Sequence, residues 1–275
     1  MQLSCGNIQL DLSRPRIMGI VNVTPDSFSD GGQHDTTSAA VAHAQKLISE
    51  GADIVDIGGE STRPMANPVS TAEELARVIP VITALRGCGA VISVDTRKPE
   101  VMQAAILAGA QMINDVQALR AEGALSIVAA SDVAVCVMHM QGEPQYMQQQ
   151  ASYKNVVAEV FDFLQQRISA LLDAGVARER IAIDPGFGFG KQLQHNLQLL
   201  KHLKVFAGLN CPVLVGMSRK AMLGALTGQG VAGREAAGLA AHLYAVSQGA
   251  NIIRVHEAAE CRDALAVWHA IEDTH

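Results

Sequence analysis

The sequence predicts a single α/β domain, a closed (β/α)8 TIM barrel preceded by a short N-terminal β-hairpin. Eight short β-rich runs alternate with longer amphipathic stretches, and polar residues gather where those runs end. The 275 residues are also close to the length of about 250 that such a barrel needs. Since no Ser- or Pro-rich linker divides the chain, we expect one domain over residues 1–275, with the hairpin at 1–14 and the barrel at 15–275.

The hairpin and strands are read from short apolar runs. Residues 3–12 are typical of two short strands that turn at Gly6-Asn7. The chain is 49% hydrophobic but only 4% aromatic, so its core must consist mainly of aliphatic side chains, which suits buried parallel strands. The predicted barrel strands are 17–23, 53–59, 91–96, 112–116, 134–140, 181–186, 213–219 and 252–256.

The stretches between these runs have helical character. Residues 37–52 end with Gly51 as the expected C-cap, and residues 71–87 begin with Thr71 as the expected N-cap. Residues 153–175 place apolar side chains at helical spacing, whereas the fourth helix, near 122–130, is short. An open doubly wound sheet could use six or seven of the strands, but eight evenly distributed units favour closure.

Composition and charge exclude several classes of function. A formal net charge of -6 argues against nucleic acid or an anionic membrane as the main partner. No apolar run reaches the 18 or so residues of a membrane span, and the N-terminus lacks the features of a signal peptide. The five cysteines are scattered without a CxxC pair, which indicates free thiols and a cytoplasmic location.

The distribution of polar residues gives the main indication of function. In a closed barrel, the carboxyl ends of all strands meet at one mouth, where active sites are built. A single Asp after a strand can simply cap a helix, but polar residues at the ends of all eight strands together indicate a functional mouth. The residues in or just after the runs are Asn22, Asp56, Glu60, Asp95, Asn114, Asp115, His139, Asp184, Arg219, Lys220, Arg254 and His256.

The chemistry of these residues suggests two adjoining pockets. Cations cluster there despite the negative net charge, which predicts an anionic substrate group, although some of them could instead pair with Asp56, Asp95 or Asp184. A buried carboxylate can accept two parallel N–H bonds from a 2-amino-4-oxo-pyrimidine ring, with a lysine and an asparagine beside it. The candidate cations are Arg63, Arg219, Lys220, Arg254 and His256, and the candidate ring-binding groups are Asp95, Asn114 and Asp184.

Other motifs do not support a nucleotide fold or a metal cage. The segment 184–191 lacks the spacing of a phosphate-binding P-loop, and the GxGxxG match at 228–233 does not follow a strand. His and carboxylate residues show no metal-ligand spacing. His139, in an apolar strand, is either a hydrogen-bonded core residue or part of the mouth.

Eight segments, taken together, resemble the bacterial dihydropteroate synthases, a family of pterin-binding enzymes. They occur in the family's order and span nearly the whole chain: GIVNVTPDSFSDGG (19–32), DIGGESTRP (56–64), SVDT (93–96), IND (113–115), MHMQG (138–142), DPGFGFGK (184–191), GMSRK (216–220) and IIRVH (252–256). The resemblance implies a transferase of folate biosynthesis that condenses 6-hydroxymethyl-7,8-dihydropterin pyrophosphate with p-aminobenzoate. It also implies Mg²⁺ as cofactor, small-molecule substrates and a homodimer.

The resemblance implies a role for each matching residue. Asp95, Asn114, Asp184 and Lys220 would bind the pterin, and Asn22, Arg63, Arg254 and His256 would surround the pyrophosphate, with Asn22 as a ligand of Mg²⁺. Phe28, Thr62 and Pro64 would border the p-aminobenzoate pocket. The residues expected to act in catalysis are Asp95, Lys220, Arg254 and His256.

Two positions depart from the family's pattern. Ala221 stands where the family usually has a serine associated with the p-aminobenzoate carboxylate, and Met65 stands where it tends to have glycine. Both changes concern the p-aminobenzoate side. Two alternatives therefore stay open: a pterin-binding methyltransferase barrel, and a non-catalytic paralogue that binds pterin.

Overall fold

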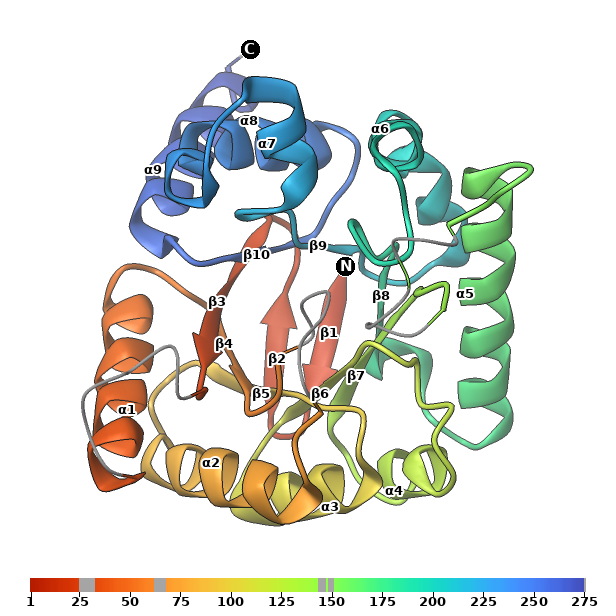
Figure 1. The fold of residues 1–275 in the computed structure, drawn as a ribbon. Coiled ribbons are helices and arrows are strands. Elements are labelled where there is room, and N and C mark those ends of the chain that lie inside the picture. The colour runs from red at the N-terminus through yellow and green to blue at the C-terminus, as the bar shows by residue number, and fades with distance from the viewer. Residues whose placement is uncertain (25–32, 62–67, 143–146, 148–150, 275) are drawn as a thin grey trace.

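The protein, described here from a computed structural model, is an eight-stranded parallel β-barrel surrounded by helices, with an antiparallel hairpin at its N-terminus (Figure 1). The structure describes all residues except 25–32, 62–67, 143–146, 148–150 and 275. The predicted (β/α)8 fold and its hairpin are thus confirmed. No helix in the described part of the chain has the length and apolar character needed to cross a membrane.

The strands form a ring in which each predicted run contributes one member. The sheet order is β8-β7-β6-β5-β4-β3-β10-β9, and β8 and β9 are joined by a parallel bridge between Ile183 and Val213. The strands are Arg16–Asn22 (β3), Ile54–Gly58 (β4), Val91–Asp95 (β5), Met112–Asp115 (β6), Ala134–Met138 (β7), Ile181–Asp184 (β8), Leu214–Val215 (β9) and Ile252–Val255 (β10).

Helices pack around the outside of this ring. The fourth, α4, is short as the sequence predicts. Gly51 follows α1 with φ +107°, and the N–H groups of Gly51 and Ala52 donate to Ile48 and Leu47, which confirms the predicted glycine C-cap. The helices are Gln33–Ser49 (α1), Thr71–Ala84 (α2), Pro99–Ala108 (α3), Ala124–Ala129 (α4), Val156–Asp173 (α5), Leu193–Lys201 (α6), Ala221–Thr227 (α7), Glu235–Ser247 (α8) and Ala258–Glu272 (α9).

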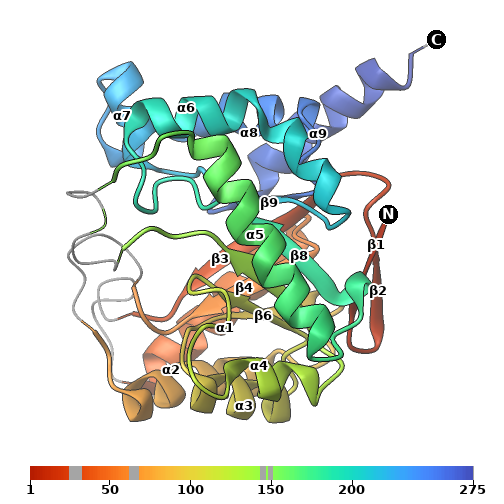
Figure 2. The same cartoon turned by 90° about the vertical axis from the view of Figure 1, so that its right-hand side faces the viewer.

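The hairpin covers one end of the barrel (Figure 2). Its strands Gln2–Cys5 (β1) and Ile8–Asp11 (β2) turn at Gly6-Asn7, and the Gly6 N–H donates to Asp132 O, just before β7. Leu3, Cys5 and Leu10 pack with the first inward-facing side chains of the barrel strands. The interior of the barrel is therefore sealed at the amino ends of the strands by apolar contacts.

Two boundaries differ from those expected. The strand predicted at 213–219 ends at Val215, because Met217–Lys220 form a turn in which Arg219 takes φ +59°. The N-cap of α2 is Ser70 rather than Thr71: the Ser70 hydroxyl accepts the Glu73 N–H at 3.2 Å. Since capping depends on which residue keeps an extended backbone, a sequence with adjacent Ser and Thr does not determine it.

The capping assignment predicts a difference between two neighbouring alanine substitutions. Ser70→Ala removes the acceptor for an orphan helix N–H and should lower the free energy of unfolding by about 1 kcal/mol. Thr71→Ala, one residue further into the helix, should change it by less than about 0.5 kcal/mol. Urea unfolding of both variants checks this, and a larger loss in Thr71→Ala would contradict the assignment.

Candidate active site

The candidate site is built from inward-facing residues of the carboxyl half of the barrel. Side chains alternate between the two faces of a strand, so the residues two positions beyond the apolar bottom layer also face inward. In β4, β5 and β6, the bottom layer is Ile54, Val91 and Met112. Two positions on, the side chains are Asp56, Ser93 and Asn114. The alternation of side chains along the strands therefore places a polar layer directly above the apolar bottom layer.

Asp56 is the centre of this polar layer. Its side chain is fully buried, and its Oδ1 accepts a hydrogen bond from Ser93 Oγ at 2.6 Å. Its Oδ2 accepts from Asn114 Nδ2 at 3.0 Å and from Arg254 Nε at 2.7 Å. Both oxygens are thus engaged by protein groups, and Asp56 holds other site residues in place.

Arg254 joins Asp56 to Asp95. Its Nη2 donates to Asp95 Oδ2 at 3.0 Å while its Nε binds Asp56, so two carboxylates share one guanidinium. The predicted pairing of mouth cations with carboxylates is therefore observed for this arginine. A planar guanidinium has five N–H groups, so donors besides these two are available to an anion at the mouth.

Asp95 is the least satisfied acceptor in this cluster. Its Oδ1 is buried and has no hydrogen-bond partner among the described residues. Burial raises the pKa of Asp95 from 3.8 to about 7, against the opposing effect of the Arg254 charge. A ligand that donates an N–H to Oδ1 would remove this deficit, which agrees with the predicted ring-binding role.

Asp184 and Lys220 lie on the opposite arc of the barrel, on β8 and after β9. Asp184 Oδ1 accepts the Gly186 N–H at 2.7 Å, and burial raises the pKa of this carboxyl while Gly186 and the Lys220 charge lower it. Lys220 Nζ lies 4.1 Å from the centroid of the Phe189 ring. Asp184, Lys220 and Phe189 therefore provide an acceptor, a donor and an aromatic surface in one place.

Arg219 and His256, two further cations expected at the mouth, contact side chains other than Asp56 and Asp95. Arg219, one of the cations expected at the mouth, forms an ion pair with Glu257 through Nε at 3.0 Å and through Nη2. The acidic residue just after β10 captures it. His256 Nδ1 lies 2.9 Å from Ser218 Oγ, which fixes the ring orientation at the end of β10.

Two other polar residues from the predicted mouth have local structural roles. Asp115 accepts the N–H groups of Gln117 and Leu119, both at 2.7 Å, and so stabilises the turn after β6. His139 is buried, and its ring is hydrogen-bonded to Lys191. Of the two interpretations of His139, a core residue or part of the mouth, the structure therefore supports the core residue. Four predicted site residues, Phe28, Thr62, Arg63 and Pro64, lie outside the described residues, as does Met65.

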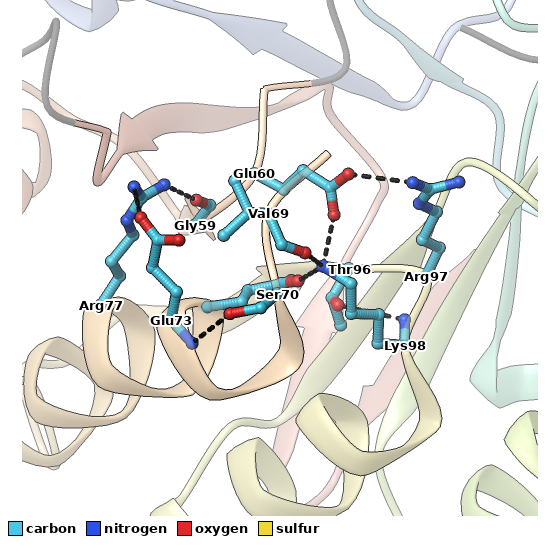
Figure 3. Close-up of polar contacts among 10 residues, drawn as sticks. Gly59, Glu60, Val69, Ser70, Glu73, Arg77, Thr96, Arg97 and Lys98 are labelled. Atoms are coloured by element: carbon cyan, nitrogen blue, oxygen red, sulfur yellow. Dashed lines mark hydrogen bonds and ion pairs between the residues drawn. The ribbon is translucent and has the colours of Figure 1, made fainter. Parts of the chain in front are cut away.

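A network that the sequence did not reveal lies beside the mouth (Figure 3). Glu60, just after β4, binds Arg97 at 2.9 Å and Lys98 Nζ at 2.5 Å. Lys98 Nζ also donates to Val69 O at 2.7 Å and to the buried Glu74 of α2. One ammonium thus links the end of β4 to the start of α2. Nothing in the sequence around Lys98 distinguishes it from a solvated lysine before a proline.

Asn22 is the candidate metal ligand. Its Oδ1 lies 3.9 Å from the point that a Cβ on Gly58 would occupy, and the Asp95 Cβ lies 3.6 Å from the same point, so Asn22 and Asp95 flank Gly58 from the two neighbouring strands. The described residues contain no group of three or more His, Cys, Asp or Glu side chains suited to hold a metal. A single amide oxygen fits Mg²⁺ that retains water and substrate phosphate ligands, rather than a metal held by protein alone.

The raised pKa of Asp95 predicts a contribution to the free energy of unfolding that depends on pH. A carboxyl whose pKa is about 7 in the folded protein and 3.8 ordinarily favours the folded state at low pH, and loses this contribution as the pH rises through 7. Asp95→Asn should therefore raise the free energy of unfolding at pH 8 relative to the native chain, by at least about 1 kcal/mol.

Chemical denaturation from pH 4 to pH 8 measures this effect. The exposed Asp263→Asn is the control and should reproduce the native pH dependence. If Asp95→Asn retains the native slope between pH 4 and 8, then Asp95 is not held at an energetic cost.

Comparison with known proteins agrees with this geometry. The model of the family "Pterin binding enzyme" matches residues 18–256. The dihydropteroate synthase of Escherichia coli (strain K12) is 49% identical over 271 residues, which are 98% of this chain and 96% of the relative. That of Neisseria meningitidis serogroup C is 49% identical over 97% of this chain and 96% of its own length.

Solved structures give the same result. Dihydropteroate synthase from Xanthomonas albilineans with 4-aminobenzoic acid has a TM-score of 0.94 and 54% identity, covering 100% of this chain and 99% of that one. A structure of the enzyme from the same organism with 7,8-dihydropteroate has a TM-score of 0.89 and 49% identity, with the same coverage. The chain therefore belongs to the family of pterin binding enzymes.

Proposed function

We infer that the chain is a transferase with dihydropteroate synthase activity: it condenses 6-hydroxymethyl-7,8-dihydropterin pyrophosphate with p-aminobenzoate to give 7,8-dihydropteroate and pyrophosphate. The carrying observation is the near full-length similarity to dihydropteroate synthases, one of them solved with 7,8-dihydropteroate. These relatives favour the synthase over the methyltransferase alternative.

The pterin ring is assigned to the space between the two arcs of the mouth. The buried acceptors of Asp95 and Asp184 can take N–H bonds from the 2-amino-pyrimidine edge, while Asn114 Oδ1 and Lys220 Nζ supply an acceptor and a donor. Asn114 Nδ2 is already bonded to Asp56, which orients its amide. Because these groups lose hydrogen bonds if the ring is altered, the pocket should be selective for pterin.

The reaction requires no protein nucleophile. The bond between the pterin methylene carbon and the pyrophosphate oxygen breaks, and its electron pair leaves with pyrophosphate. The aniline nitrogen of p-aminobenzoate attacks the methylene carbon and then loses a proton. An ionised Asp95 stabilises the positive charge that develops on the pterin, and the remaining N–H groups of Arg254 with His256 stabilise the charge on the leaving group.

Mg²⁺ is the proposed cofactor, and Asn22 would be its protein ligand. When bound, the ion would neutralise part of the charge on the leaving pyrophosphate. Arg63, Phe28, Thr62 and Pro64 keep their predicted roles toward the pyrophosphate and p-aminobenzoate as proposals.

Assembly and location are finer parts of the proposal. A homodimer is supported by exposed apolar side chains on α7, α8 and α9, among them Leu226, Tyr244 and Ile271, which a second copy of the chain could cover. A cytoplasmic location is supported by the free thiols, since each of the five cysteines is unpaired.

The first test follows both products. The purified protein, given the pterin pyrophosphate, p-aminobenzoate and Mg²⁺, should release pyrophosphate and form dihydropteroate in equal amounts, and chelation of Mg²⁺ should stop both. Lys220→Ala should weaken pterin binding by well over tenfold, because it removes the donor between Asp184 and Phe189. The exposed Lys204→Ala is the control. Pterin binding without either product would identify a non-catalytic paralogue.

Ala221 gives a prediction for the acceptor substrate. It is exposed at the start of α7, directly after Lys220. Ala221→Ser would restore the family's hydroxyl, and one added hydrogen bond of about 1 kcal/mol should lower the KM for p-aminobenzoate by about fivefold. Steady-state kinetics should show no change in the KM for the pterin substrate. Ala225→Ser, one turn further along α7, is the matched control, and an equal effect in both variants would argue against a local contact.

A further inference from the structure

Lys191 is a buried lysine that the reaction described above does not use. It is 2% exposed and follows the segment Gly186–Gly190, which connects β8 to α6. Its Nζ lies 2.9 Å from His139 Nδ1, 3.2 Å from His139 O, 2.9 Å from Gly186 O and 3.0 Å from Phe189 O. A buried ammonium is costly unless its N–H groups find acceptors, and here every neighbour is one.

The protonation states of the pair follow from these contacts. Burial and the Lys191 charge lower the pKa of His139 to about 2, so the ring is neutral and its Nδ1 can accept. Burial lowers the pKa of Lys191 to about 7, and the Asp184 charge opposes this shift. Three carbonyl oxygens that converge on one point would repel each other without a cation between them. The ammonium form is therefore the one that fits the site.

The segment held by Lys191 lies against the end of β7. A Cβ on Gly186, at φ +71°, would lie 2.0 Å from His139 O, and a Cβ on Gly190, at φ +61°, would lie 2.3 Å from Gln141 O. Only glycine allows this approach and this backbone conformation. The glycines let the backbone reach β7, and the Lys191 ammonium links the two by binding carbonyls of both.

Other groups complete the hydrogen bonding of this segment. The buried Asn196 accepts the Gly188 N–H at 2.8 Å and donates to Lys191 O at 3.1 Å. Tyr153 donates its hydroxyl proton to Gly190 O at 2.8 Å. The segment is thus anchored from behind at several points, of which Lys191 is the only one that carries a charge among these contacts.

The front of the same segment carries part of the pterin pocket. Asp184, the last residue of β8, accepts the Gly186 N–H, and the Phe189 ring packs against Lys220 Nζ. Lys191 binds the carbonyl groups of Gly186, which donates its N–H to Asp184, and of Phe189, whose ring faces Lys220. A displacement of these carbonyl groups would also displace the Phe189 ring and the Gly186 N–H, on which the pocket depends.

We propose that Lys191 is a positioning residue of the pterin pocket: its buried ammonium binds the carbonyls of His139, Gly186 and Phe189, and so fixes Phe189 against Lys220 and Gly186 against Asp184. This inference rests on the proposed pterin-binding role of Asp184 and Lys220.

The test combines pterin affinity with a direct probe of Phe189. Lys191→Met keeps the length and apolar stem of the side chain but removes the ammonium. Calorimetry with 6-hydroxymethyl-7,8-dihydropterin should show at least a tenfold loss of affinity, whereas the exposed Lys201→Met should bind as the native chain does. Fluorine NMR of protein labelled with 4-fluorophenylalanine, with Phe189→Leu for assignment, should show the Phe189 resonance shifted or broadened and the Phe206 resonance unchanged.

Several outcomes overturn the proposal. A folded Lys191→Met with native pterin affinity does so, and so does a loss of affinity with an unmoved Phe189 resonance. If Lys191→Met does not fold, Lys191→Gln, which keeps a neutral donor, should bind the pterin more weakly than the native chain and show a shifted or broadened Phe189 resonance; native behaviour of that variant is equally contrary. Failure of the native chain to bind the pterin would count against the proposed function instead, and the Phe189 resonance would still test Lys191.

Discussion

The contact of Arg254 with Asp56 and Asp95 determines the arrangement of the rest of the mouth. These three residues come from β10, β4 and β5, and Asn114 of β6 joins them through Asp56. The guanidinium charge of Arg254 offsets part of the desolvation cost of the two carboxyl groups that it binds. The adjacent strands β4, β5 and β6 are therefore linked by one charged network to β10, which lies beyond β3 in the sheet.

In this network both carboxylate oxygens of Asp56 accept hydrogen bonds from described residues, whereas only one oxygen of Asp95 does. Asp56 has three donors, whereas Asp95 has one, leaves Oδ1 without a partner among the described residues and has a pKa of about 7. The imbalance costs stability, and it is located where a ligand is expected to donate. A site of this kind is preorganised: the folding of the barrel supplies the energy that holds the acceptor ready, and the ligand recovers part of it on binding.

The fold, and the polar residues at the strand ends from which the site is built, could be predicted because both depend on periodicity along the chain. Strand runs alternate at period two, and a polar residue at the end of a buried strand, such as Asp56 or Asp184, is conspicuous in the sequence. Partners could not be predicted, since they depend on strand tilt and on loops that bring distant residues together. The pairing of Arg219 with Glu257, the burial of Lys191 and the bonds of Lys98 all belong to this second class.

Lys98 and Lys191 occupy similar positions in the chain on the two sides of the mouth. Each follows a barrel strand, precedes a helix and directs its ammonium to backbone carbonyls as well as to side chains. Lys98 binds two carboxylates, whereas Lys191 binds neutral acceptors, and burial lowers the pKa of Lys191 to about 7. The segment after β8 is thus held by a lysine that binds no carboxylate among the hydrogen bonds described. Because that segment carries Phe189 and donates the Gly186 N–H to Asp184, the pterin side of the mouth is where a change in a cation behind the site should reach the ligand most directly.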